Sequence, residues 1–168
     1  MKNNYPEKNY DKENMARAFG KSLPISFKQS IEICNFIRDK NVSYAKNVLS
    51  RVIEHKQAIP FKRFNDNMGH KKNIMAGRYP KSASMEILEL INSVEANAQF
   101  KGLNTANLVI TYLTANKASK VMHSGRKRSR LSKRTNVDIV VQEKAEGKNL
   151  EEQKKGKKDV KAKEEDKK

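Results

Sequence analysis

Two segments rich in β-branched residues, Asn107-Leu-Val-Ile-Thr-Tyr-Leu-Thr114 and Val137-Asp-Ile-Val-Val141, frame about 20 residues of basic and small polar character. Both segments have the composition of strands. The simplest connection is an antiparallel hairpin over about residues 111–137 whose far end projects from the domain. At about 3.3 Å per residue, ten residues out and ten back would reach roughly 30 Å. A two-stranded ribbon alone is marginal in water, so we expect this arm to need a partner surface.

The charge of the arm indicates what that partner is. The sequence has no acidic residue between Glu95 and Asp138, and four of its nine arginines fall between positions 126 and 134. The planar guanidinium of Arg matches phosphate oxygens and stacks on bases. We therefore predict that the arm contacts an anionic partner rather than lying as a solvated loop. The candidate contacts are Lys117, Lys120, Arg126, Lys127, Arg128, Arg130, Lys133 and Arg134.

The whole chain agrees with a polyanionic partner. In 168 residues, Lys and Arg number 36 and Asp and Glu number 19, which gives a net charge of +17. No run of about 18 apolar residues is present, so no membrane helix is expected. The N-terminus lacks the apolar core of a signal peptide, and one Cys cannot form a disulfide framework. We expect an intracellular protein without a membrane partner.

The rest of the chain predicts helices and one long loop. A short edge strand is expected at 23–26, helices at about 27–40, from Asn41 or Ser43 to before Ile59, and at 81–100, and a loop at about 58–80. Gly102 would end the third helix. We predict a polar N-terminal arm at 1–22, a single RNA-binding core domain at 23–146, and a disordered tail of mixed charge at 147–168.

Two further groups are candidate RNA contacts. The loop group comprises Lys62, Arg63, Lys71, Lys72, Arg78, Tyr79 and Lys81. In it, Arg78 would bind phosphate and Tyr79 a base or ribose. The alternative, compatible with this one, is that Tyr79 and Pro80 dock the start of the third helix. The second group, Arg17, Lys21 and Lys28, lies near the first strand and is as compatible with plain surface as with phosphate contacts.

The sequence favours no catalytic, cofactor or metal site. His55, His70 and His123 are far apart and lack metal-ligand spacing. Cys34 falls on the apolar face of the first helix, where it is expected in the core. No nucleophile has a base and an orienting group nearby. We therefore expect no enzyme, no cofactor and no small-molecule substrate.

Several blocks of the sequence, in order, resemble one known family. They are Arg17-Ala-Phe-Gly20, Leu23-Pro-Ile-Ser-Phe-Lys28, Val52-Ile-Glu-His55, Ile59-Pro-Phe-Lys-Arg63, Gly77-Arg-Tyr-Pro80, Lys81-Ser-Ala83 and Glu95-Ala-Asn-Ala-Gln-Phe-Lys-Gly102. The family is the universal large-subunit ribosomal protein number twenty-two in its archaeal and eukaryotic form, numbered seventeen in the older eukaryotic scheme. The similarity covers about residues 16–144. The family signature also fits Gly125-Arg126 followed by Asn136, Val137, Ile139 and Val141, whereas Met122 and His123 depart from it and the arm is a few residues short.

The resemblance implies an α+β domain of three helices on a small three-stranded antiparallel sheet. It also implies that the domain sits on large-subunit rRNA beside neighbouring ribosomal proteins in the cytoplasmic ribosome. The hairpin would aid assembly and line the nascent-peptide exit tunnel. Its tip, next to the nascent peptide, would comprise His123, Ser124, Gly125, Arg126, Lys127 and Arg128. The alternatives are a non-ribosomal RNA-binding or RNA-chaperone module and, with no cofactor pocket to support it, an RNA-modifying enzyme.

Overall fold

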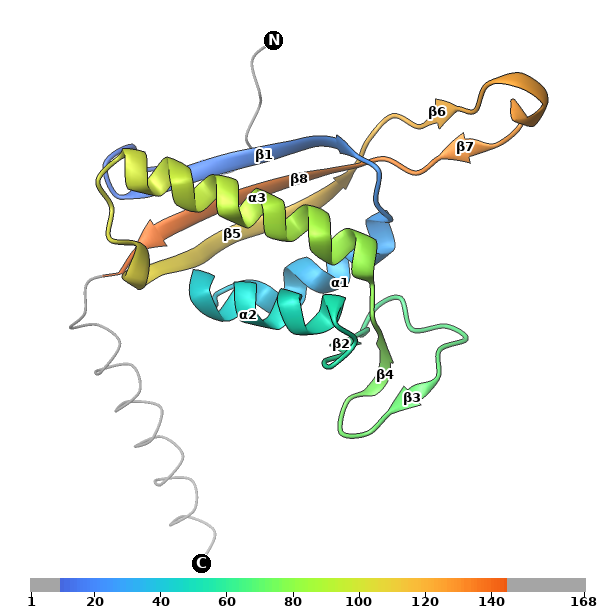
Figure 1. Ribbon diagram of the computed structural model, residues 1–168, viewed down its shortest axis with the longest axis horizontal. Helices are drawn as coiled ribbons and strands as arrows, with labels where there is room; N and C mark the ends of the chain where they lie inside the picture. The colour runs from blue at the N-terminus through green and yellow to red at the C-terminus, as the bar shows by residue number, and fades with distance from the viewer. Residues whose placement is uncertain (1–9, 145–168) are drawn as a thin grey trace, which may run out of the picture.

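A three-stranded antiparallel sheet forms the centre of the molecule. The computed structural model describes residues 10–144. The strands are Met15–Leu23 (β1), Leu108–Lys117 (β5) and Thr135–Glu143 (β8), in the order β1-β8-β5. Three helices pack against the sheet, Phe27–Ile37 (α1), Val42–Ile53 (α2) and Lys81–Phe100 (α3) (Figure 1). The predicted α+β fold is confirmed.

Alternation along β8 explains how the sheet meets the helices. Val137, Ile139 and Val141 are fully buried in the hydrophobic core, because side chains two apart on a strand share a face. Helix α3 packs along β1 and against β8, α1 packs against β5, and α2 packs against α3. The core therefore lies between the sheet and the helices, and the basic side chains remain for the outside.

The first strand differs from its prediction. The prediction of an edge strand at 23–26 was wrong, since β1 is Met15–Leu23 and Ser26 is the N-cap of α1. Strand β1 pairs with β8 from Met15↔Gln142 to Leu23↔Thr135. Its inward positions are the small residues Ala16, Ala18 and Gly20, which give little hydrophobic signal in the sequence. Residues 15–22 thus belong to the sheet and not to the predicted polar arm.

The predicted end of α3 is confirmed in detail. Gly102 has a φ of +77°, in the left-handed region that glycine enters without cost. Its N–H donates to the Gln99 carbonyl (2.9 Å), and the Leu103 N–H donates to the Ala98 carbonyl (3.1 Å). This pair of bonds is a Schellman motif, which satisfies the last carbonyls of the helix. By contrast α1 ends at Ile37, earlier than the predicted residue 40.

The segment predicted as one long loop contains a second small sheet. Its strands are Ile59–Pro60 (β2), His70–Lys71 (β3) and Met75–Arg78 (β4), in the order β2-β4-β3. Strands of two to four residues are too short to show a periodic pattern in the sequence. Where β2 meets β4, a Cβ added to Gly77 would lie 3.3 Å from the Ile59 carbonyl oxygen, so the close approach favours glycine.

The hairpin is confirmed as a protruding element. Strands β5 and β8 pair as far as Lys117↔Thr135, and beyond them lie Val121–Met122 (β6) and Leu131–Ser132 (β7). Figure 1 shows this end of the hairpin projecting away from the sheet and helices. The predicted tail at 147–168 and the first nine residues lie outside the described residues.

Candidate nucleic-acid interface

The basic hairpin, residues 117–134, is built by short stretches of pairing. Beyond the long strands, the Ala118 N–H donates to the Arg134 carbonyl (3.1 Å), and the His123 N–H donates to the Arg130 carbonyl (3.0 Å). Between these bonds, Val121 pairs with Ser132 and Met122 with Leu131. Arg134 is half-buried, whereas the other seven predicted cations of the hairpin are exposed. The pairing therefore holds the cations outward on a narrow ribbon.

The hairpin closes in a single turn of 3₁₀ helix, Gly125–Lys127 (η2). Gly125 has a φ of +64°, which explains why glycine stands at this turn. All six predicted tip residues, His123, Ser124, Gly125, Arg126, Lys127 and Arg128, are exposed. The ribbon also exposes Val121, Met122 and Leu131, so apolar side chains accompany its charge.

The basic loop, residues 61–81, is fixed to α1 by a buried carboxylate. Glu32 is 2% exposed. Its Oε1 accepts hydrogen bonds from the backbone N–H groups of Arg63 (2.8 Å) and Phe64 (3.0 Å), and its Oε2 accepts one from Lys62 (3.1 Å). These three bonds order the loop backbone and leave the Lys62 and Arg63 side chains exposed. The sequence analysis missed Glu32, because no motif marks a carboxylate whose partners are backbone groups about thirty residues away.

Tyr79 directly precedes Pro80, the N-cap of α3, and its ring contacts residues outside that helix. Its ring lies 5.4 Å from that of His55, at the end of α2, and the Lys71 Nζ lies 5.5 Å from the Tyr79 ring centroid. Tyr79 is half-buried, while Lys71, Lys72, Arg78 and Lys81 are exposed. The tyrosine thus ties the small sheet to α2 and keeps part of its ring accessible.

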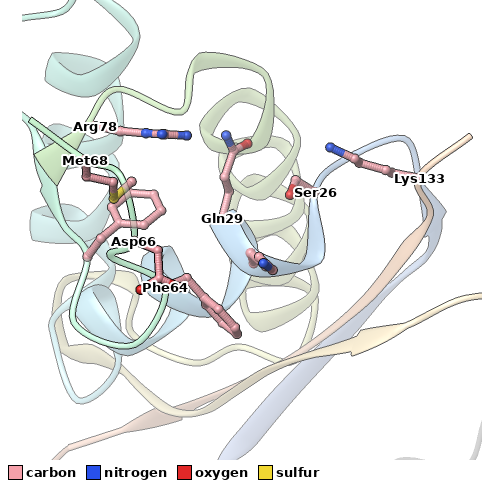
Figure 2. A pocket seen from close by; sticks show the side chains of 9 residues that line it. Ser26, Gln29, Phe64, Asp66, Met68, Arg78 and Lys133 are labelled. Atoms are coloured by element: carbon pink, nitrogen blue, oxygen red, sulfur yellow. The ribbon is translucent and has the colours of Figure 1, made fainter.

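The structure places the predicted contacts near the first strand, Arg17, Lys21 and Lys28, at two separate positions. The Arg17 guanidinium stacks on the Tyr10 ring, with Cζ 4.4 Å from its centroid, and Lys21 is exposed on the same strand. Lys28, in the first turn of α1, instead lines a cavity with Arg78 of β4 and Lys133 of the hairpin. Figure 2 shows Arg78 and Lys133 reaching toward one another from opposite sides of this cavity. Loop, helix and hairpin therefore meet at Lys28.

The cations of the basic hairpin and the basic loop take no part in the ion pairs described among residues 10–144. Those ion pairs join Lys46 to Glu95 and Lys56 to Glu54. The hydrogen bond and the charge of Lys56 hold the pKa of Glu54 below its ordinary value. The exposed Lys and Arg side chains of this interface can pair with phosphate groups, which is how proteins bind the RNA backbone.

Within residues 10–144, no three His, Cys, Asp or Glu side chains gather as metal ligands would. None of the helices described there is long and apolar enough to cross a bilayer.

Comparison with known proteins identifies the family. The family model "Ribosomal protein L22p/L17e" matches residues 18–142. A protein of Archaeoglobus fulgidus named large ribosomal subunit protein uL22 is 38% identical over 147 residues, which span 83% of this chain and 95% of the relative. The protein of the same name from Methanoculleus marisnigri is 42% identical over 139 residues, spanning 78% of this chain and 91% of the relative. The resemblance found in the sequence is confirmed, and this chain belongs to the ribosomal protein L22p/L17e family.

Proposed function

We propose that this protein is a structural component of the large ribosomal subunit that binds large-subunit rRNA. The observation that carries the proposal is the basic hairpin, which projects from the domain and exposes seven cations on a ribbon without acidic residues. Such a ribbon gains stability from an anionic surface that encloses it. The names of the relatives support the large subunit as that surface.

The hairpin has a second role in this proposal. It threads between rRNA helices during assembly, and its tip lines the nascent-peptide exit tunnel beside neighbouring ribosomal proteins. The family resemblance supports this placement, as does a tip whose six residues are all exposed. The exposed Val121, Met122 and Leu131 suit a wall that is contacted by both RNA and peptide.

Sedimentation tests the first part of the proposal. A cell lysate is washed with high salt, separated on a sucrose gradient and probed for this chain. Electrostatic binding alone weakens steeply with salt, whereas a threaded hairpin has to withdraw before the protein leaves. We expect one copy per large subunit after the wash. Recovery in the light fractions would contradict the proposal and favour a free RNA-binding or RNA-chaperone module.

A shortened hairpin tests the second part. Replacing residues 120–132 with Asn-Gly provides a two-residue turn between Ser119 and Lys133 and leaves the sheet intact. The matched control keeps the length of the hairpin and changes the five cations in that segment to Gln. Comparing the two variants separates the effect of hairpin length from the effect of its charge. We expect the shortened chain to fold but to give fewer complete large subunits. Normal assembly and translation with the shortened hairpin would overturn the proposed role.

A further inference from the structure

A cavity opens where α1, the basic loop and the hairpin meet. Its volume is about 220 Å³, slightly below the roughly 300–1,000 Å³ of pockets that enclose drug-sized ligands. Three cations line it, Lys28, Arg78 and Lys133, and apolar side chains come from Phe61, Phe64 and Met68. Figure 2 shows Gln29 lying between the facing ends of Arg78 and Lys133. The cavity therefore combines an apolar part with a cationic part and has the size of a small planar group.

A second hollow adjoins this cavity. The two share Ser26, Lys28 and Lys133, and the second has a volume of about 440 Å³. Its further lining includes Lys117, Lys120 and Arg134, with no acidic residue. Because three residues line both hollows, the two lie side by side at the start of α1, and together we call them the groove. Phosphates lying in the second hollow would meet only cations among its charged lining residues.

The start of α1 adds to the attraction for anions. The first N–H groups of a helix have no partner within it, and the helix dipole places partial positive charge there. No acidic residue occupies the first turn of α1, and the Ser26 side chain makes no capping hydrogen bond. The helix end and the cations of the groove thus favour the same ligand charge.

The apolar part of the cavity indicates more than a phosphate site. Phe64 is half-buried, and Glu32 fixes its backbone N–H. The Lys28 Nζ lies 5.5 Å and the Arg63 Cζ lies 5.4 Å from the centroid of the Phe64 ring. The acid in the lining, Asp66, would repel phosphate but accepts hydrogen bonds from base amino and imino groups. An aromatic ring flanked by cations is the usual platform for an unstacked RNA base.

We propose that this cavity binds one unstacked nucleotide of the rRNA. The base stacks on Phe64, and its flanking phosphates pair with Lys28 and Lys133 as the strand continues along the second hollow. This inference rests on the proposed function, because it names the element of RNA that the interface takes. The proposal gives Phe64 the stacking contact with the base and Asp66 the hydrogen bonds to its amino and imino groups. The charge pattern of the sequence does not single out either residue.

The test uses fluorescence of the full chain. The sequence contains no Trp, so Phe64→Trp introduces a single indole at the stacking position. The probes are a single-stranded RNA pentamer and the same pentamer with an abasic central nucleotide. We expect the intact pentamer to quench the indole and to bind roughly 5- to 150-fold more tightly than the abasic one, as the loss of one stacked base predicts.

Two further variants make the result specific. Phe64→Leu keeps an apolar side chain and should bind both pentamers equally, as measured with labelled RNA. Lys133→Gln should weaken binding of both pentamers by the same factor, because it removes a phosphate contact. Equal binding of the two pentamers by the unmodified chain, or no quenching in Phe64→Trp, would overturn the nucleotide pocket. If the protein stays with the large subunit but shows equal binding of the two pentamers or no quenching, only the nucleotide pocket is disproved. If the protein is lost from the subunit, the proposed function is disproved.

Discussion

Asp138 shows the cost of a carboxylate buried in a sheet. It lies on β8 between the core residues Val137 and Ile139 and is 3% exposed. Among the described residues its Oδ1 has no hydrogen-bond partner. Burial raises the pKa of Asp138, and a hydrogen bond from Asn116 partly opposes the rise. The folded state therefore holds this proton more tightly than the unfolded chain, so ionisation of Asp138 destabilises the fold as pH rises above the ordinary carboxyl range.

Replacing this group with a neutral one should stabilise the protein. We expect Asp138→Asn to raise the free energy of unfolding by about 1 kcal/mol near neutral pH, since an amide costs less to bury than a carboxylate. The gain should shrink toward about pH 4, where Asp138 is increasingly protonated. Urea unfolding near neutral pH and at about pH 4 measures this gain in the free energy of unfolding. The control is Asp66→Asn, an exposed position, and equal effects of the two substitutions would contradict the explanation.

Cys34 should report unfolding through its reactivity. It is 1% exposed on α1, as predicted from its helical spacing. Burial raises the pKa of its thiol to about 12, while the charge of Arg38 acts in the opposite direction. Since the thiolate is the reactive species, a thiol reagent at about pH 8 should label the chain only after unfolding. Rapid labelling in the absence of denaturant, followed by mass spectrometry, would show that the core opens more readily than this packing implies.

At the scale of single residues, the sequence predicts the core and the cations but not the contacts that position them. Cys34 and Ile37 were recoverable because a helix repeats its buried face every three to four residues. Lys28, Arg78 and Lys133 were recoverable as cations, yet their meeting at one cavity depends on tertiary packing. Glu32 and Phe64 had no signal, since a buried acid bonded to a distant backbone follows no local pattern.

At the scale of elements, Glu32 determines whether the basic loop is ordered. Removing its carboxylate leaves three partly buried backbone donors without this acceptor. We expect Glu32→Ala to lower the free energy of unfolding by about 3 kcal/mol, because hydrogen bonds to a charged group are worth about 1.5–3 kcal/mol each and water replaces some of them. Glu32→Gln keeps one acceptor oxygen and should lose less.

Hydrogen exchange of the loop amides distinguishes this explanation from a general loss of packing. In Glu32→Gln, protection should fall at Lys62, Arg63 and Phe64 and stay unchanged in α3. Uniform loss of protection over the whole domain would show that Glu32 supports the core and not the loop.

Two physical causes explain the elements that the sequence did not predict. Strand β1 buries Ala16 and Ala18, whose small side chains make no clear hydrophobic pattern. Strands β2 and β3 have two residues each, so no period can be seen in them. Helix α3, by contrast, has 20 residues with a buried stripe and a glycine at its end, and its predicted range was confirmed. The sequence predicted those elements that are long and whose buried face is clearly more hydrophobic than their exposed face.

At the scale of the whole molecule, the salt dependence of RNA binding should separate the hairpin from the rest of the charge. Each neutralised phosphate contributes a slope of roughly 0.7–0.9 to the fall of log affinity with log salt. Replacing residues 120–132 with Asn-Gly removes five cations, so the slope for large-subunit rRNA should fall by up to roughly 4. Removing residues 147–168, which carry nine basic and six acidic residues, is the control and should change the slope by less. Filter binding at several salt concentrations measures both. If the two deletions lower the slope equally, net charge and not the placement of cations on the hairpin governs binding, and the interface described for this fold would lose its specific role.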